Sequence, residues 1–81
     1  MTFPLRIFSI DRELFVGPAK SITLPSVQGE IQILPNHEPL ISLLQEGNMV
    51  IESQEGADQT IPIAGGVVEI KPTETVVLVN F

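Results

Sequence analysis

The feature that most constrains the fold of this 81-residue chain is its division into short apolar runs by turn-forming residues. Glycine, proline or a polar cluster interrupts the sequence about every eight to ten residues, a spacing typical of an antiparallel sandwich or barrel. No segment repeats apolar residues at the helical positions i, i+3, i+4 and i+7 for three turns. The sequence therefore predicts an all-β fold without a helix.

Nine strands are expected within a single domain, residues 1–81. They span Leu5–Ile10, Glu13–Gly17, Ala19–Leu24, Glu30–Leu34, Leu40–Leu44, Met49–Ser53, Gln59–Ala64, Val67–Ile70 and Thr75–Asn80. The predicted turns and corners between them contain Gly17, Pro25 with Gly29, Pro35 with Pro39, Glu46–Asn48, Glu55–Asp58, Gly65 with Gly66, and Lys71–Glu74.

Two of these strands carry more apolar residues than one buried face needs. In the first strand Leu5 and Ile7 share one face, while Phe8 and Ile10 occupy the other, and Leu40–Leu44 is apolar on both faces. Because each sheet of a sandwich has one inner side, the surplus should reach the surface as a patch of the kind that marks an interaction site. The alternative is that strand ends and loops cover these side chains.

The charge balance excludes several classes of function. Four Lys plus Arg stand against ten Asp plus Glu, which gives a formal net charge of −6. The cations are scattered along the chain at Arg6, Arg12, Lys20 and Lys71. A nucleic-acid surface or a polybasic membrane anchor needs clustered cations, so neither is expected. No apolar run reaches the length of a membrane span, and the N-terminal MTFPLRIF does not resemble a signal peptide.

The sequence also lacks a catalytic signal. His37 is the only histidine, no serine lies in a GxSxG motif, and the chain contains no cysteine for a disulfide or a thiolate metal site. Gly65-Gly66 is not followed by the Lys-Ser/Thr of a phosphate loop, and a bulge or a positive-φ turn is the favoured interpretation. We predict no catalytic residue, no cofactor and no metal site.

The lone histidine lies in a corner bracketed by two prolines. Pro39 disfavours helical angles at Glu38, and Pro35 fixes its own φ and lacks a hydrogen-bond donor. The segment Pro35–Pro39 should therefore end one strand and direct the next. A structural role for His37, through hydrogen bonds to nearby backbone, is favoured over catalysis, and a contact with a partner is the main alternative.

Three motifs in order resemble one protein family. They are FVG (Phe15–Gly17), GEIQILPNHEPLI (Gly29–Ile41) and IAGGVVEI (Ile63–Ile70), and together they are similar to the N-terminal domain of the epsilon subunit of rotary ATP synthases. The similarity covers essentially the whole chain. It implies a flattened two-sheet antiparallel β-sandwich of about nine to ten short strands. It also implies a non-catalytic rotor subunit that packs on the gamma subunit and the c-ring and helps to couple ion flow to ATP synthesis.

The resemblance also implies which residues face each partner. The loop facing the c-ring corresponds to Gln28, Gly29, Glu30 and Ile31, and positions against or near gamma correspond to Ser9, His37 and Ser42. The surplus apolar residues Phe8, Ile10 and Ile41 are an independent physical reason to expect that this part of the surface contacts gamma. Such a subunit would be peripheral on the cytoplasmic face of a bacterial-type energy-transducing membrane, held there by other subunits.

Most family members continue into two C-terminal helices, which inhibit ATP hydrolysis and in some cases bind ATP. Since this sequence stops at Phe81, we expect neither activity, and no ATP binding. The alternative function is a free-standing cytosolic β-sandwich that binds a protein or peptide. A sugar platform is disfavoured because the chain has four Phe and no Trp or Tyr.

Overall fold

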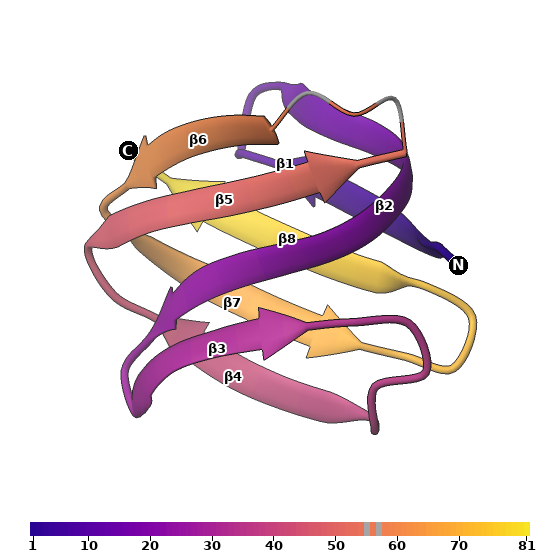
Figure 1. The fold of residues 1–81 in the computed structure, drawn as a ribbon. Coiled ribbons are helices and arrows are strands. Elements are labelled where there is room, and N and C mark those ends of the chain that lie inside the picture. Colours follow the sequence, from indigo (N-terminus) through magenta and orange to yellow (C-terminus); the bar gives the residue numbers. More distant parts are fainter. Residues whose placement is uncertain (55, 57) are drawn as a thin grey trace.

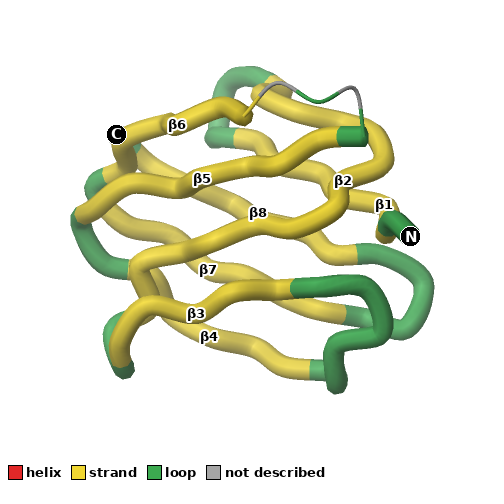
Figure 2. Tube along the Cα trace, in the orientation of Figure 1, coloured by secondary structure: helices red, strands yellow, loops and turns green. Residues whose placement is uncertain are grey.

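A computed structural model describes residues 1–54, 56 and 58–81, and the described part of the chain is all-β (Figures 1 and 2). Its eight strands are β1 (Phe3–Phe8), β2 (Glu13–Ser26), β3 (Gly29–Ile33), β4 (Leu40–Leu44), β5 (Gly47–Ser53), β6 (Asp58–Ile63), β7 (Gly65–Ile70) and β8 (Thr75–Asn80). The prediction of a β-sandwich without a helix is confirmed.

The strands form two layers that are joined through β2. One layer has the order β1-β8-β7-β4, and the other contains β3, β2, β5 and β6. Figure 1 shows β7 and β8 behind β2 and β5. The first half of β2 pairs with β1, whereas its last residue, Ser26, pairs with Leu44 of β4, so both ends of β2 contact the other layer.

Two of the predicted strands are in fact one. The predicted break after Gly17, placed there as a turn, is wrong: Gly17 and Pro18 continue β2 and pair with Leu5 and Pro4 of β1. Pro18 lies in the part of β2 that pairs with β1 alone, where a missing N–H is tolerated, as it is at a sheet edge. The described residues therefore form eight strands instead of the nine predicted.

One pairing departs from the antiparallel rule. β1 and β8, which are the first and last strands, run parallel from the Leu5–Thr75 pair to the Phe8–Leu78 pair. All other strand pairs are antiparallel. The two ends of the chain are therefore held in neighbouring strands.

The core lies between the layers and follows the alternation of each strand. Leu5 and Ile7 of β1 are buried, as the face pattern predicts, and the hydrophobic residues with little or no exposure are Phe3, Leu5, Ile7, Ala19, Ile22, Leu24, Ile33, Leu44, Met49, Ile51, Ile63, Val68, Ile70, Val77 and Val79. At about 25 cal/mol per Å² of apolar surface removed from water, this cluster is the main stabilising contribution to the fold.

The predicted corner at Pro35 and Pro39 is present in the connection between β3 and β4. The predicted turn at Gly65 and Gly66 is wrong by one residue: both glycines lie in β7 and pair with Asn80 and Val79 of β8, and the corner is at Ala64. The Ala64 N–H donates to the Asn80 carbonyl at 2.8 Å and closes that corner. The predicted turn at Glu55–Asp58 lies partly outside the described residues.

Candidate interaction surface

The outward side of the β1-β8-β7-β4 layer carries a row of apolar side chains, one from each strand. Leu43 of β4 lies opposite Val67 of β7, Val67 lies opposite Leu78 of β8, and Leu78 lies opposite Phe8 of β1. Leu43 is 62% exposed and Leu78 is 40% exposed, and Phe8 and Val67 are partly exposed. Strand register thus gathers residues far apart in sequence into one apolar strip, which we call the apolar row.

A second row runs beside the apolar row on the same face. It contains Ile41, Glu69, Val76 and Arg6, again in register across β4, β7, β8 and β1. Ile41 is 68% exposed. We call the two rows together the outer face; it is mostly apolar and has one acidic and one basic residue.

A shallow hollow lies at one end of the outer face. Its volume is about 530 Å³, and its lining includes Ile10, Val67, Leu78 and Phe81. Ile10 is 99% exposed at the tip of the β1–β2 hairpin, beside this hollow. The hollow extends the apolar row and has room for bulky side chains of a partner.

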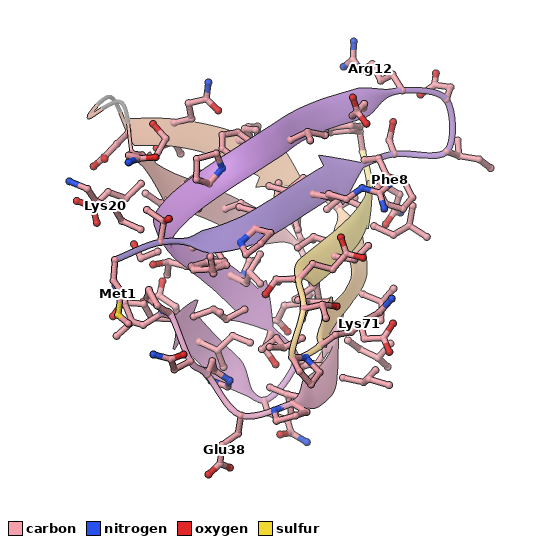
Figure 3. All side chains as sticks on the ribbon, turned by 90° about the vertical axis from the view of Figure 1, so that its right-hand side faces the viewer. Met1, Phe8, Arg12, Lys20, Glu38 and Lys71 are labelled. Atoms are coloured by element: carbon pink, nitrogen blue, oxygen red, sulfur yellow. The ribbon has the colours of Figure 1, made fainter. Side chains whose placement is uncertain are left out.

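The cationic side chains near the outer face interact with other residues of the same chain. The Arg6 guanidinium lies 5.7 Å from the centre of the Phe8 ring and 4.0 Å from the Glu74 carboxylate. The Lys71 ammonium lies 4.0 Å from the other oxygen of Glu74. Figure 3 shows Phe8 and Lys71 on the same side of the molecule. Glu74 therefore has two cationic neighbours.

The residues predicted to face gamma are distributed unevenly over this surface. Phe8 and Ile41 lie on the outer face, and Ile10 lies at its edge. Ser9 is buried, and its hydroxyl donates to the Asp11 carboxylate at 2.9 Å inside the β1–β2 hairpin.

Ser42 lies on the side of β4 opposite to Ile41 and Leu43. Its hydroxyl is 2.8 Å from the hydroxyl of Ser26, which is buried at the end of β2. The pair links β4 to β2 where the two layers meet. Ser42 thus supports the strand that carries Ile41 and Leu43 on its outward face.

His37 is exposed in the corner between β3 and β4. Its Nδ1 donates to the Glu38 carbonyl at 2.7 Å, and its backbone N–H donates to the Leu34 carbonyl at 3.2 Å. Asn36 has a φ of 68°, a left-handed turn conformation that asparagine tolerates. The predicted backbone hydrogen bonding of His37 is confirmed.

The segment predicted to face the c-ring is the β2–β3 hairpin turn. Gln28, Gly29 and Glu30 are exposed there, and Ile31 is half-buried. The Ser26 hydroxyl accepts the Gln28 N–H at 3.2 Å, and Gly29 has a φ of 118°. The turn lies at the opposite end of β3 from the His37 corner.

The described residues contain no group of three His, Cys, Asp or Glu side chains that could hold a metal ion. Within the same residues, no helix is long and apolar enough to cross a membrane.

Comparison with known families identifies the fold. The model of the β-sandwich domain of the ATP synthase delta/epsilon chain matches residues 2–81. The chain belongs to this family. An ATP synthase epsilon chain from Bordetella petrii is 38% identical over 79 residues, which are 98% of this chain and 56% of that relative. The chain thus spans about half the length of the relative.

Chains in solved structures share this fold. A chain of the Euglena gracilis mitochondrial ATP synthase superimposes with a TM-score of 0.84 and 28% identity, over 98% of this chain and 49% of that one. A chain from the central stalk and c-ring of the Tetrahymena thermophila mitochondrial ATP synthase superimposes with a TM-score of 0.86. It is 13% identical over 100% of this chain and 65% of its own length, and it shows the fold alone.

Sequence reasoning missed part of the outer face of this delta/epsilon sandwich. Val67, Glu69, Val76 and Leu78 were not predicted as site residues, although they form its centre. A signal existed in TVVLVNF, which is apolar on both faces of its strand in the same way as the first strand. Placing Glu69 there required the register between β7 and its two neighbours.

Proposed function

We propose that this chain is the β-sandwich of an ATP synthase epsilon subunit and acts as a non-catalytic part of the central rotor. In this role it helps to couple ion-driven rotation of the c-ring, through gamma, to ATP synthesis in the catalytic head. The family membership and the relative from Bordetella petrii support the assignment. The apolar row is the observation that carries the proposed contact with gamma.

The apolar row has the properties of a protein interface. Leu43 and Leu78 keep a large part of their surface in water, and aligned register makes the row continuous across four strands. Removing such surface from water upon docking is favourable by about 25 cal/mol per Å². In the proposed orientation gamma contacts the outer face, which includes Phe8 and Ile41, together with Ile10 at its edge.

The remaining proposed contacts surround this face. Ser9 and Ser42 hold the β1–β2 hairpin and β4 in place, and His37 lies in the corner that leads into β4. The β2–β3 turn, Gln28–Ile31, would face the c-ring. The sandwich would then be peripheral on the cytoplasmic face of an energy-transducing membrane, held there by the other subunits and contacting an H⁺- or Na⁺-driven ring.

The first test is co-purification of the tagged protein from its own cells. We expect gamma and subunits of the catalytic head to accompany it. A tagged protein that elutes as a free monomer without gamma would contradict the rotor assignment and favour a free-standing binding module.

A second test measures binding to a purified, gamma-containing catalytic head. Leu43→Ser should weaken the affinity by about tenfold or more, because a buried leucine contributes about 1.5–3 kcal/mol. The matched control is Val27→Ser, since Val27 is 51% exposed in the β2–β3 turn, outside the outer face, and the purified head has no c-ring for this turn to contact. Equal loss in both variants would contradict a contact through the apolar row.

A further inference from the structure

Glu69 is the one acidic residue in the middle of the outer face. On β7 it lies opposite Ile41 of β4 and Val76 of β8, and Val67 precedes it by two residues on the same side of the strand. Three of its nearest neighbours on this face are therefore aliphatic. A partner that covers the apolar row also removes water from around the Glu69 carboxylate.

No cation of the chain neutralises Glu69 in the part that the structure describes. Arg6 lies in the same cross-strand row, but its guanidinium is close to Glu74 and the Phe8 ring. Lys71, two residues after Glu69, also lies beside Glu74. The two ion pairs found among the described residues both use Glu74, and neither includes Glu69.

Covering an unpaired carboxylate with apolar surface is costly. The effective penalty for taking an ion out of water is several kcal/mol, and it is offset only when an opposite charge with suitable hydrogen bonds accompanies it. A purely apolar partner would therefore bind the outer face poorly. The favourable partner has a lysine or arginine surrounded by apolar side chains.

We propose that Glu69 selects the partner of the outer face by pairing with a lysine or arginine of gamma. The inference rests on the proposed function, because it assigns a specificity residue within the same docking surface. Ile41, Val67 and Val76 surround the carboxylate and would exclude water from the ion pair. The apolar row contributes affinity, and the charge at Glu69 discriminates against partners that lack a cation at this position.

The test compares two substitutions at Glu69 with one matched control, in binding to a purified catalytic head that contains gamma. Glu69→Gln removes the charge at similar size, and Glu69→Lys reverses it. Glu30→Lys is the control, because Glu30 is exposed on β3 in the other layer and the head lacks the c-ring. Thermal melts of each variant check that it is folded, which we expect because both residues are at exposed strand positions.

We expect Glu69→Gln to weaken binding by about thirtyfold or more, the range for losing one partner of a desolvated ion pair, and Glu69→Lys to weaken it further because it adds a repulsive charge. Glu30→Lys should bind within about twofold of wild type.

Two outcomes would overturn the inference, and they have different meanings. If wild type binds, Leu43→Ser weakens binding and Glu69→Lys binds like wild type, Glu69 does not select the partner and the proposed function stands. If the wild-type chain does not bind the head, the proposed docking on gamma fails and this inference fails with it.

Discussion

Gly66 lies against the backbone of Leu78 so closely that a Cβ on Gly66 would collide with the Leu78 carbonyl oxygen. The same Cβ would lie 3.0 Å from the Cα of Val79, the residue that pairs with Gly66 across β7 and β8. Gly66 also has a φ of 154°, which L-residues rarely adopt. The pairing of β7 with β8 beside the apolar row therefore requires glycine, a residue without a side chain, at position 66.

Gly66→Ala should consequently destabilise the fold by about 2 kcal/mol or more, since backbone strain and a backbone clash add to each other. Gly29→Ala is the matched control, because Gly29 has a φ of 118° but no atom within 4 Å of its added Cβ. Backbone strain alone should lower the free energy of unfolding of Gly29→Ala by about 1 kcal/mol. Urea unfolding of both variants measures the difference. A Gly66→Ala midpoint equal to that of wild type would contradict this account.

The hydroxyl pair of Ser26 and Ser42 should contribute to stability where the layers meet. Ser26→Ala leaves the Ser42 hydroxyl and the Gln28 N–H without this partner, which should cost about 1–2 kcal/mol. A double-mutant cycle with Ser42→Ala should show coupling of about 0.5 kcal/mol or more in the free energy of unfolding. Strictly additive losses would show that the two hydroxyls act independently.

His37→Ala should affect the corner and leave the chemistry of ATP turnover unchanged. Among the described residues, the exposed His37 ring has one hydrogen bond, to the adjacent Glu38 carbonyl, so its loss should cost about 1 kcal/mol or less in stability. The assembled complex should hydrolyse ATP at the wild-type turnover number, with any loss confined to coupling or assembly. A collapse of turnover in an assembled, coupled complex would point to a chemical role for His37.

The 81-residue sandwich should not bind ATP. A triphosphate needs converging cations or backbone N–H groups, yet Arg6 and Lys71 lie beside Glu74 and Arg12 lies over the Phe81 ring at 5.9 Å. The net charge of −6 further opposes an anionic ligand. Calorimetry at millimolar ATP and Mg²⁺ should show no binding isotherm, and a saturable isotherm would refute the prediction.

The local pattern predicted most strand positions because one buried face imposes a period of two. It could not show that Gly17 and Pro18 continue β2, since both residues are ordinary turn formers and only the pairing with β1 accommodates them. Nor could it show that β1 runs parallel to β8, a contact between the two ends of the sequence.

The candidate surface was predictable in kind but not in extent. Phe8 and Ile41 are apparent as surplus apolar residues within their own strands. Glu69 and Leu78 can be recognised as surface residues of this patch only from their cross-strand neighbours, and these depend on the register of four strands. Ser42 is the opposite case. The resemblance implies that it faces a partner, whereas in the structure its hydroxyl lies beside that of Ser26.

The parallel pairing of β1 with β8 has a consequence for synthesis on the ribosome. Phe3–Phe8 is made before the other strands of this sandwich, but one of its two neighbouring strands is complete only when Asn80 has been added. Until then the outward-facing Phe8 lacks its Leu78 neighbour, and the edge of β1 that β8 will occupy offers unpaired N–H and C=O groups to other chains. The nascent sandwich is therefore vulnerable to aggregation until its last strand has left the exit tunnel, and a long-range closure of this kind is intrinsically slow.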